Sequence, residues 1–215
     1  VSALGPVGLL DVKPRPLADW SPMLKRVEDI VLGSILTLVA LPVMALIALA
    51  IRLESNGPVL FVQRRSGLNR RPFDVLKFCT MTVAENGADV RQAQQNDPRV
   101  TRTGRILRRF SLDELPQLFN VLKGEMSLVG PRPHAIAHDD EWTDVVERYA
   151  NRHQVKPGLT GLAQIEGWRG ESDTTDKVQA RVERDLAYIS SWTLWLDLKI
   201  IAVTGWVVLK GKNAY

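Results

Sequence analysis

Apolar residues are concentrated in two stretches of this 215-residue chain, and the longer one covers residues 30–51. Its 22 residues carry no charged side chain. About 20 apolar residues suffice for a helix to cross a bilayer core roughly 30 Å thick, so the stretch predicts a membrane helix. The alternative is a buried core helix, which a soluble chain of this size would have to cover on every face. We favour the membrane helix.

A proline in the middle of this stretch predicts a kink. Pro42 cannot donate a helical hydrogen bond, and its ring clashes with the preceding turn. Basic residues flank both ends of the stretch, and basic flanks tend to stay on the cytoplasmic side. They are Lys25, Arg26, Arg52, Arg64, Arg65, Arg70 and Arg71. A kinked helix that enters and leaves by the same face satisfies both flanks, so we expect a re-entrant helix over 30–51 rather than a straight span.

The second apolar stretch covers residues 192–210 and contains two charged residues, Asp197 and Lys199. It also holds three tryptophans, Trp192, Trp195 and Trp206. Tryptophan is enriched at the membrane interface, where amphipathic helices lie in the plane of the bilayer. We expect an amphipathic interfacial helix here, with an ordinary core helix as the alternative.

Between these stretches the pattern indicates a small sheet followed by helices. Residues 58–65 and 72–78 alternate as two short strands around a polar linker. Helical patterns then cover 86–95, 100–110, 113–123, 137–150 and 174–190, and two proline-rich connectors follow Gly130 and Lys156. The expected fold class is therefore α+β and mostly helical: a re-entrant Pro-kinked membrane helix, a small β-hairpin or sheet, a helical core and a C-terminal amphipathic helix.

Composition excludes several classes of protein. A hydrophobic fraction of 45% and a charged fraction of 24% are those of a globular chain, so wholesale disorder is excluded. The single cysteine, Cys79, excludes an internal disulfide and a thiolate metal cluster. A net charge of +4 favours anionic partners, among which nucleic acid, anionic lipid and phosphorylated substrates all qualify.

The first residues differ from the rest because they are rich in proline and show no periodicity. Residues 1–21 are interpreted as a linker from a missing N-terminal part. One membrane-associated catalytic domain is expected over 22–215.

The candidate chemistry lies just after a run of five arginines, which are Arg99, Arg102, Arg105, Arg108 and Arg109. Guanidinium groups bind phosphate in a bidentate manner, although a basic stripe is also common on solvated or lipid-facing surfaces. Asp113 and Glu114 follow this run. Ser111 and Glu114 match a capping box, whereas Pro116 favours Asp113 as the N-cap. In either case, the two carboxylates lie at a helix N-terminus, where N–H groups and the helix dipole attract phosphate.

Two carboxylates among arginines suit phosphoryl transfer with a divalent ion. Magnesium is typically held by one or two carboxylates together with substrate phosphates and water. A carboxylate can also attack phosphorus and form an acyl phosphate, which splits one transfer into two easier steps. The spacing does not decide which carboxylate has which role.

Several motifs in order resemble the bacterial sugar transferase family, the monotopic phosphoglycosyl transferases. They are LKRVEDIVLG, GPVLFVQRRSG, LKFCTM, DPRVTRTGRILRRFSLDELPQL, GEMSLVGPRP and KPGLTGLAQIEGWRG, and they extend over about residues 22–215. The later segments GWRGESDT and YISSWTLWLDLKII are similar to the undecaprenyl-phosphate glucose phosphotransferases. Those belong to the long form of the family, in which a membrane-helix bundle and a further domain precede this part.

The resemblance implies the transfer of a sugar-1-phosphate from a UDP-sugar, UDP-glucose being expected, to undecaprenyl phosphate with release of UMP. This would be the first membrane step of exopolysaccharide or capsule synthesis. It implies a place at the bacterial inner (cytoplasmic) membrane, with the catalytic domain on the cytoplasmic face. Membrane lipids are expected partners and nucleic acid is not, and a homo-oligomer stays open.

The resemblance also implies roles for residues. Asp113 corresponds to the nucleophile that becomes phosphoglycosylated, and Glu114 to its partner in holding Mg²⁺. The expected phosphate-binding residues are Lys77, Arg108 and Arg132. The further candidates for substrate binding are Arg109 and Gln164.

One departure from the family pattern concerns Cys79, which stands where members commonly carry an arginine. If that arginine binds substrate, either another arginine of the arginine run must compensate here or activity is weakened. Two other readings remain: a membrane-tethered nucleic-acid- or lipid-binding module that uses the arginine run, and a catalytically silent scaffold of a polysaccharide assembly complex.

Overall fold

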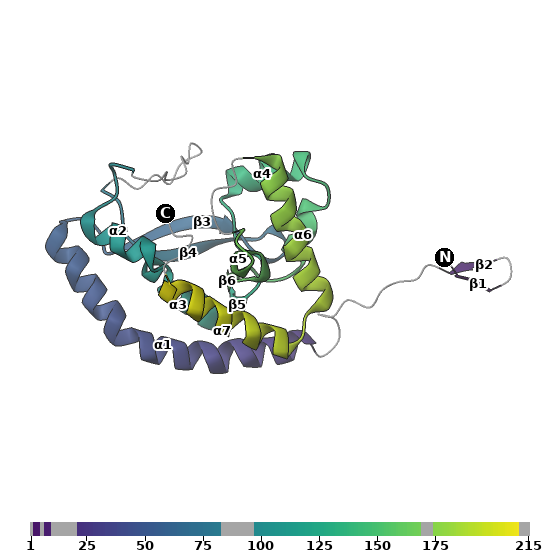
Figure 1. The fold of residues 1–215 in the computed structure, drawn as a ribbon, viewed down its shortest axis with the longest axis horizontal. Helices are drawn as coiled ribbons and strands as arrows, with labels where there is room; N and C mark the ends of the chain where they lie inside the picture. The colour runs from purple at the N-terminus through teal and green to yellow at the C-terminus, as the bar shows by residue number, and fades with distance from the viewer. Residues whose placement is uncertain (1, 5–6, 10–20, 83–96, 169–173, 211–215) are drawn as a thin grey trace.

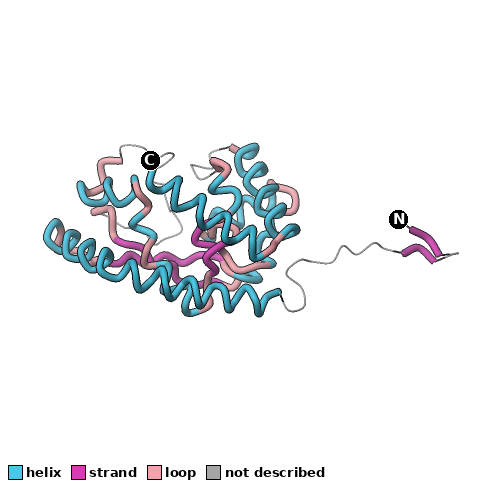
Figure 2. The backbone as a smooth tube through the Cα atoms, turned by 60° about the horizontal axis from the view of Figure 1, so that its bottom comes forward, coloured by secondary structure: helices cyan, strands magenta, loops and turns pink. Residues whose placement is uncertain are grey.

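The computed structural model describes residues 2–4, 7–9, 21–82, 97–168 and 174–210, and these are mostly helical with small sheets. In chain order, the longer elements are the helix α1 (Ser21–Glu54), the strands β3 (Leu60–Ser66) and β4 (Pro72–Phe78), and the helices α2 (Arg102–Arg109) and α3 (Gln117–Lys123). They continue with β5 (Ser127–Val129), α4 (Ile136–Val145), β6 (Gly158–Thr160), α5 (Leu162–Ile165), α6 (Thr175–Ser191) and α7 (Leu194–Lys210). The strands β3 to β6 lie at the centre of the main body, with α1 along one side (Figures 1 and 2).

The helix α1 is continuous through Pro42 and leaves most of its apolar surface exposed. Leu38, Val39 and Leu46 each keep about two thirds or more of their side-chain surface accessible (71%, 69% and 68%). A buried core helix is therefore wrong. In the described part of the chain, α1 is the one helix long and apolar enough to cross a membrane. The re-entrant path stays a prediction.

One face of α1 is nevertheless buried along its whole length. The buried positions are Lys25, Glu28, Asp29, Gly33, Thr37, Met44, Ile47 and Ile51, which recur at helical spacing. Gly33 has no side chain to separate α1 from α3, and a Cβ there would lie 3.4 Å from Val121 and Leu122. Met44 and Ile51 pack with Phe78 and Leu107 at the other end. This candidate membrane helix is thus attached to the rest of the chain by a continuous seam.

The two basic residues before the apolar stretch belong to this seam. The Lys25 ammonium pairs with Asp197 at 2.7 Å and with Asp29 at 3.4 Å. The Arg26 guanidinium donates to the carbonyl oxygens of Val121 and Leu122, both at 2.7 Å, at the C-terminal end of α3. These charges are part of the packing, so they give no support to the re-entrant prediction.

In α7 a charged residue lies on the buried face and apolar residues lie on the exposed face, which is the reverse of the expected amphipathic pattern. Asp197 is fully buried and accepts hydrogen bonds from the Tyr188 hydroxyl (2.8 Å) and the Trp192 indole N–H (2.9 Å). The exposed face carries apolar side chains, among them Trp195 and Trp206. The amphipathic pattern is not confirmed, and Trp192 is a core residue rather than an interfacial one. An interfacial position for α7 stays a prediction.

The strands β3 and β4 form the predicted antiparallel hairpin, with Phe61 opposite Lys77 and Arg65 opposite Phe73. A second pair, β5 and β6, is parallel and lies where proline-rich connectors were expected. It brings Gly130 and Gly158 into contact, and a Cβ on Gly158 would lie 2.1 Å from the Gly130 nitrogen. Only glycine allows this approach.

The predicted helices agree unevenly with the structure. Those over 100–110 and 174–190 are confirmed as α2 and α6. The helix expected over 113–123 is divided, because Pro116 is the N-cap of α3 and a 3₁₀ turn, η2 (Leu112–Glu114), precedes it. The one expected over 137–150 ends at Val145, and a 3₁₀ helix, η3 (Tyr149–Gln154), follows.

Two further predictions concern segments that lie wholly or partly outside the described residues. The helix expected over 86–95 lies outside the described residues. Within 1–21, the described residues before Ser21, where α1 begins, form two short antiparallel strands, β1 (Ser2–Leu4) and β2 (Val7–Leu9). The linker role of 1–21, and a single domain over 22–215, stay predictions.

Candidate active site

The two adjacent carboxylates lie in the turn η2, between the arginine-bearing helix α2 and the short helix α3. Ser111 begins this turn in a left-handed conformation (φ 54°). Neither expected cap forms, because Ser111 makes no capping hydrogen bond and the N-cap of α3 is Pro116. Both carboxylates are therefore left available for contacts with other parts of the chain.

Glu114 is the centre of a buried ion cluster, with 7% of its surface accessible. Its Oε1 atom accepts a hydrogen bond from the Lys77 ammonium at 3.0 Å. The Arg132 guanidinium donates to both carboxylate oxygens, with Nη1 3.1 Å from Oε2. Such bidentate pairs fix orientation as well as supplying attraction. Two predicted phosphate-binding residues thus meet at Glu114, from β4 and from the loop after β5.

Asp113 differs from its neighbour because, among the described residues, its carboxylate accepts no hydrogen bond. Burial raises its pKa above the ordinary value of 3.8, and the adjacent Glu114 carboxylate raises it further. Lys77, Arg108 and Arg132 act in the opposite direction. A carboxylate with raised basicity and no hydrogen-bond partner is a stronger nucleophile than a solvated one, and the surrounding cations suit a phosphate-bearing substrate.

Arg65 is a member of this cluster, although its position in the sequence indicated only a place in the basic flank. Strand alternation places it on the same hairpin face as Lys77. Burial lowers its pKa to about 10, with the nearby Arg132 contributing. Its guanidinium donates to the Gln63 side-chain oxygen at 2.7 Å and to the Pro133 carbonyl. The period-two alternation of the strand was the signal that could have identified it.

The loop that carries Arg132 is held from a second side by Arg152. This buried guanidinium donates to the Arg132 carbonyl at 2.6 Å and to Asp185 at 2.9 Å. It also donates to the Tyr149 hydroxyl (3.1 Å), which itself donates to Asp139 (2.6 Å). Because Arg65 holds the next carbonyl along the chain, the backbone on both sides of the Arg132–Pro133 bond is restrained, and the Arg132 side chain is directed by it.

The remaining predicted residues have different surroundings. Arg108 donates to the Thr80 hydroxyl at 3.0 Å and lies close enough to Asp113 to lower its pKa. Arg109 is exposed, and its guanidinium lies 5.6 Å above the Phe110 ring, so the structure does not bring it into the cluster. Gln164 is buried on α5, where its Oε1 has no hydrogen-bond partner in the described part of the chain.

Cys79 follows the strand that carries Lys77. Its thiol contacts the Met81 carbonyl at 3.4 Å. Cys79 therefore supplies no guanidinium group at this position, where the family resemblance leads us to expect an arginine. Besides Arg132, which contacts Glu114 directly, Arg65 and Arg108 are guanidinium groups near the acidic pair.

The donor set is suited to magnesium only with help from a substrate. Among the described residues, no group of three or more acidic, histidine or cysteine side chains is placed to hold a metal ion. Asp113 and Glu114 offer two adjacent carboxylates, which is the usual protein share of a magnesium shell completed by phosphate oxygens and water. The residues fit a Mg²⁺ ion that arrives with a phosphorylated substrate.

The sequence is similar to a known family and to several known proteins. A family model described as "Bacterial sugar transferase" matches residues 20–211. A UDP-glucose:undecaprenyl-phosphate glucose-1-phosphate transferase of Escherichia coli (strain K12) is 54% identical over 200 residues, covering 93% of this chain and 43% of the relative. The protein of the same name from Klebsiella pneumoniae is 50% identical, with the same coverage.

A third relative of that name is comparable in length to the chain. It comes from Caulobacter vibrioides and is 54% identical over 191 residues, which cover 89% of this chain and 72% of the relative. The chain spans less than half the length of the two preceding relatives.

Proposed function

The chain belongs to the bacterial sugar transferase family, and from that premise we propose that it transfers glucose-1-phosphate from UDP-glucose to undecaprenyl phosphate, with release of UMP. The names of the three relatives support the donor and the acceptor. The observation that carries the proposal is the half-buried Asp113 carboxylate, without a hydrogen-bond partner among the described residues, beside the Glu114–Lys77–Arg132 cluster.

The reaction proceeds in two balanced steps. In the first, an Asp113 oxygen attacks the phosphorus attached to glucose, the bond to the bridging oxygen breaks, and UMP leaves with that oxygen. In the second, an undecaprenyl phosphate oxygen attacks the same phosphorus, the bond to Asp113 breaks, and the carboxylate is regenerated. The product is undecaprenyl diphosphate glucose.

The cations of the cluster supply the electrostatics of this chemistry. Lys77, Arg108 and Arg132 offset the charge of the donor phosphates close to Asp113, where burial strengthens each interaction. Arg132 is held by a bidentate contact with Glu114, so it is oriented before substrate binds. Magnesium, when bound by Asp113 and Glu114, would supply further charge neutralisation for the leaving UMP.

The acceptor requires a membrane, and α1 supplies the attachment. Its exposed apolar face and length are those of a membrane segment. We place the reaction at the cytoplasmic face of the inner membrane, because UDP-sugars are the donors. Whether α1 is re-entrant decides only how the active site is held at that surface.

The test is UMP release by the purified chain in detergent with UDP-glucose, undecaprenyl phosphate and Mg²⁺. We expect Asp113→Asn to lower the rate by about a thousandfold or more, since it removes the nucleophile. The matched control is Asp144→Asn, which changes an exposed aspartate of α4 and should leave the rate unchanged. Equal rates for the two variants would contradict the role of Asp113.

The covalent step has a test of its own. Incubation with UDP-glucose alone should give a protein heavier by one glucose phosphate in intact-mass spectrometry, and Asp113→Asn should give none. UMP release without any adduct would indicate direct transfer and would overturn the two-step reaction.

A further inference from the structure

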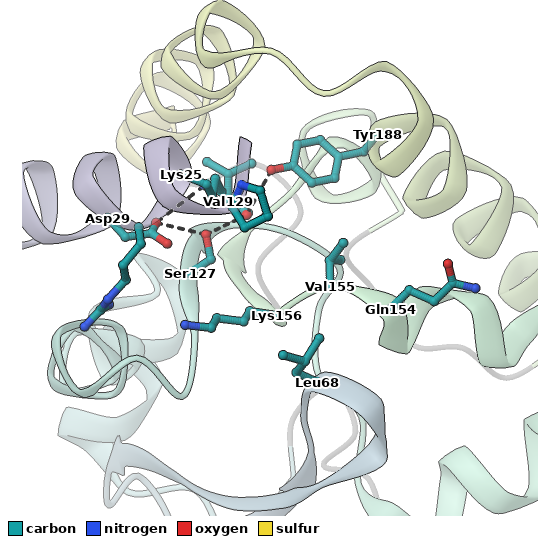
Figure 3. A pocket seen from close by; sticks show the side chains of 11 residues that line it. Lys25, Asp29, Leu68, Ser127, Val129, Gln154, Val155, Lys156 and Tyr188 are labelled. Atoms are coloured by element: carbon teal, nitrogen blue, oxygen red, sulfur yellow. Dashed lines mark hydrogen bonds and ion pairs between the residues drawn. The ribbon is translucent and has the colours of Figure 1, made fainter. Parts of the chain in front are cut away.

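A cavity of about 220 Å³ lies beside the start of α1, and no step proposed above uses it. Its walls come from the first turns of α1 as far as Asp29, from β5, from Tyr188 of α6, from the end of η3 and the loop after it, and from Leu68 in the β3–β4 turn (Figure 3). Arg26 and Lys156 contribute its basic wall, and the Lys156 side chain extends across the cavity toward α1. The apolar wall includes Pro22 and Val155 as well as Leu68.

The charges around this cavity are unequally compensated. Lys25 also lines it, but Asp197 and Asp29 neutralise Lys25. The Oδ1 atom of Asp29 is also occupied by the Ser127 hydroxyl and by the Leu128 N–H, both at 2.9 Å. Within the described residues, neither Arg26 nor Lys156 has a carboxylate partner. The carbonyl oxygens that bind Arg26 orient its guanidinium without neutralising it.

These two cations converge on one point. A Cβ on Gly124 would lie 3.3 Å from Arg26 Nη2 and 3.5 Å from Lys156 Nζ. Burial and the nearby Arg26 lower the pKa of Lys156, and Asp29 acts in the opposite direction. Gly124 has a positive φ of 88°, so the position disfavours any residue whose side chain would fill this space. A single phosphate group could contact both cations.

The surroundings define the rest of the ligand. Met23 and Leu24, on the same turn of α1 as Pro22, are exposed apolar residues (63% and 48%). An anion alone would use only the basic wall, whereas an amphiphile would also cover the apolar wall and continue along α1. We propose that this cavity binds the phosphate headgroup of a lipid through Arg26 and Lys156. This site is separate from the Asp113 reaction centre and does not rest on the proposed reaction.

The experiment measures ligand binding to the purified chain in detergent by calorimetry. The probes are dihexanoyl phosphatidic acid, a short-chain polyprenyl monophosphate and inorganic phosphate. We expect both lipids to bind, and Lys156→Gln to weaken them about tenfold because one charge-assisted hydrogen bond to phosphate is lost. The matched control is Lys123→Gln, an exposed lysine at the end of α3 close to the same surface, which should change affinity less than about twofold.

The outcomes separate the sources of the phosphate. Binding of phosphatidic acid in a Lys156-dependent manner identifies a site for membrane phospholipid, and dependence for the polyprenyl probe alone identifies an acceptor-type lipid. Inorganic phosphate that binds as tightly as the lipids would overturn the lipid assignment. Equal losses in Lys156→Gln and Lys123→Gln, or no binding by any probe, would overturn the site itself. Asp113→Asn should retain lipid binding while it abolishes turnover, so the two proposals can fail independently.

Discussion

Two buried ion clusters in this molecule are built from the same residue types and differ in what they leave unsatisfied. Around Asp197, Lys25 pairs with three carboxylates, and Tyr188 and Trp192 donate hydrogen bonds, while the buried Glu28 carboxylate accepts no hydrogen bond among the described residues. Around Glu114, Lys77 and Arg132 compensate one carboxylate, while Asp113 accepts no hydrogen bond among the described residues and Arg65 and Arg108 add positive charge.

The difference shows how burial can serve two purposes. The Asp197 cluster joins α1, α6 and α7, and its lysine is shared among three carboxylates, so it offers no excess of positive charge to a phosphorylated ligand. The Glu114 cluster keeps an excess of cations and one basic carboxylate, which a phosphorylated substrate would complete. Variants that affect one cluster should therefore change stability, and variants of the other should change activity.

The largest effect is expected for Asp197→Ala. It leaves the Lys25 ammonium buried beside fewer carboxylates and the Trp192 N–H without its acceptor, while the Tyr188 hydroxyl keeps the Val129 carbonyl, so we expect the free energy of unfolding to fall by about 3–5 kcal/mol. Chemical denaturation in detergent measures it. The exposed Asp144→Ala is the control, expected within about 0.5 kcal/mol of the native chain. A loss below about 1 kcal/mol for Asp197→Ala would show that the cluster does not hold these helices together.

The next effect is on catalysis. Arg132→Lys keeps the charge but loses the bidentate contact with Glu114, so we expect kcat/KM to fall about a hundredfold with little change in thermal stability. UMP release gives the rate. Arg109→Lys, which affects the arginine above Phe110, should change the rate less than about threefold. A comparable loss of kcat/KM in both variants would show that Arg109 also contributes to substrate binding.

A pH profile tests the electrostatics of Asp113. Because its pKa is raised and its ionised form is the nucleophile, kcat/KM should rise with pH through a midpoint above 3.8. Lys77 lowers this pKa, so Lys77→Gln should move the midpoint to higher pH. The sign for stability is opposite: ionisation of a carboxyl with a raised pKa disfavours the folded state, so Asp113 contributes less stability as pH rises. An unchanged midpoint in Lys77→Gln would contradict the proximity of the two groups.

The smallest expected effect is a difference in the free energy of unfolding between variants of Trp192 and Trp195. Trp192→Phe removes the indole N–H that Asp197 accepts, so we expect a loss of about 1–2 kcal/mol in the free energy of unfolding. Trp195→Phe, at a residue with 77% of its surface exposed, should change it by less than about 0.5 kcal/mol. Similar values for the two would contradict the assignment of Trp192 to the core.

Local pattern was sufficient for several parts of the fold and of the site. Alternation in 58–65 and 72–78 predicted the hairpin, and 22 uncharged residues predicted a helix with an exposed apolar face. Resemblance of the motifs identified the family and the residues that meet at Glu114. These features depend on neighbours within one or two turns of the chain, or on residue identities that a sequence displays directly.

Other parts could not be predicted because they depend on contacts between distant segments. Lys25 and Asp197 are far apart in sequence, and each one alone resembles a charge near a membrane boundary. The parallel pair of β5 and β6 joins two stretches of three residues that contain no strand pattern of their own. Arg65 was one basic residue among several until the hairpin register placed it beside Arg132 and Glu114.

The sequence by itself determined the family, the membrane-type helix and the acidic pair that follows the arginine run. Only the tertiary structure decided which charges are compensated within the protein and which are available to a ligand. Lys25 pairs with Asp197, and Arg132 is directed at Glu114. Asp113, Arg26 and Lys156 have no such ion-pair contact in the described part of the chain. The physical reason is that compensation of a buried charge is set by the atoms within a few ångströms of it, and folding alone brings those atoms together.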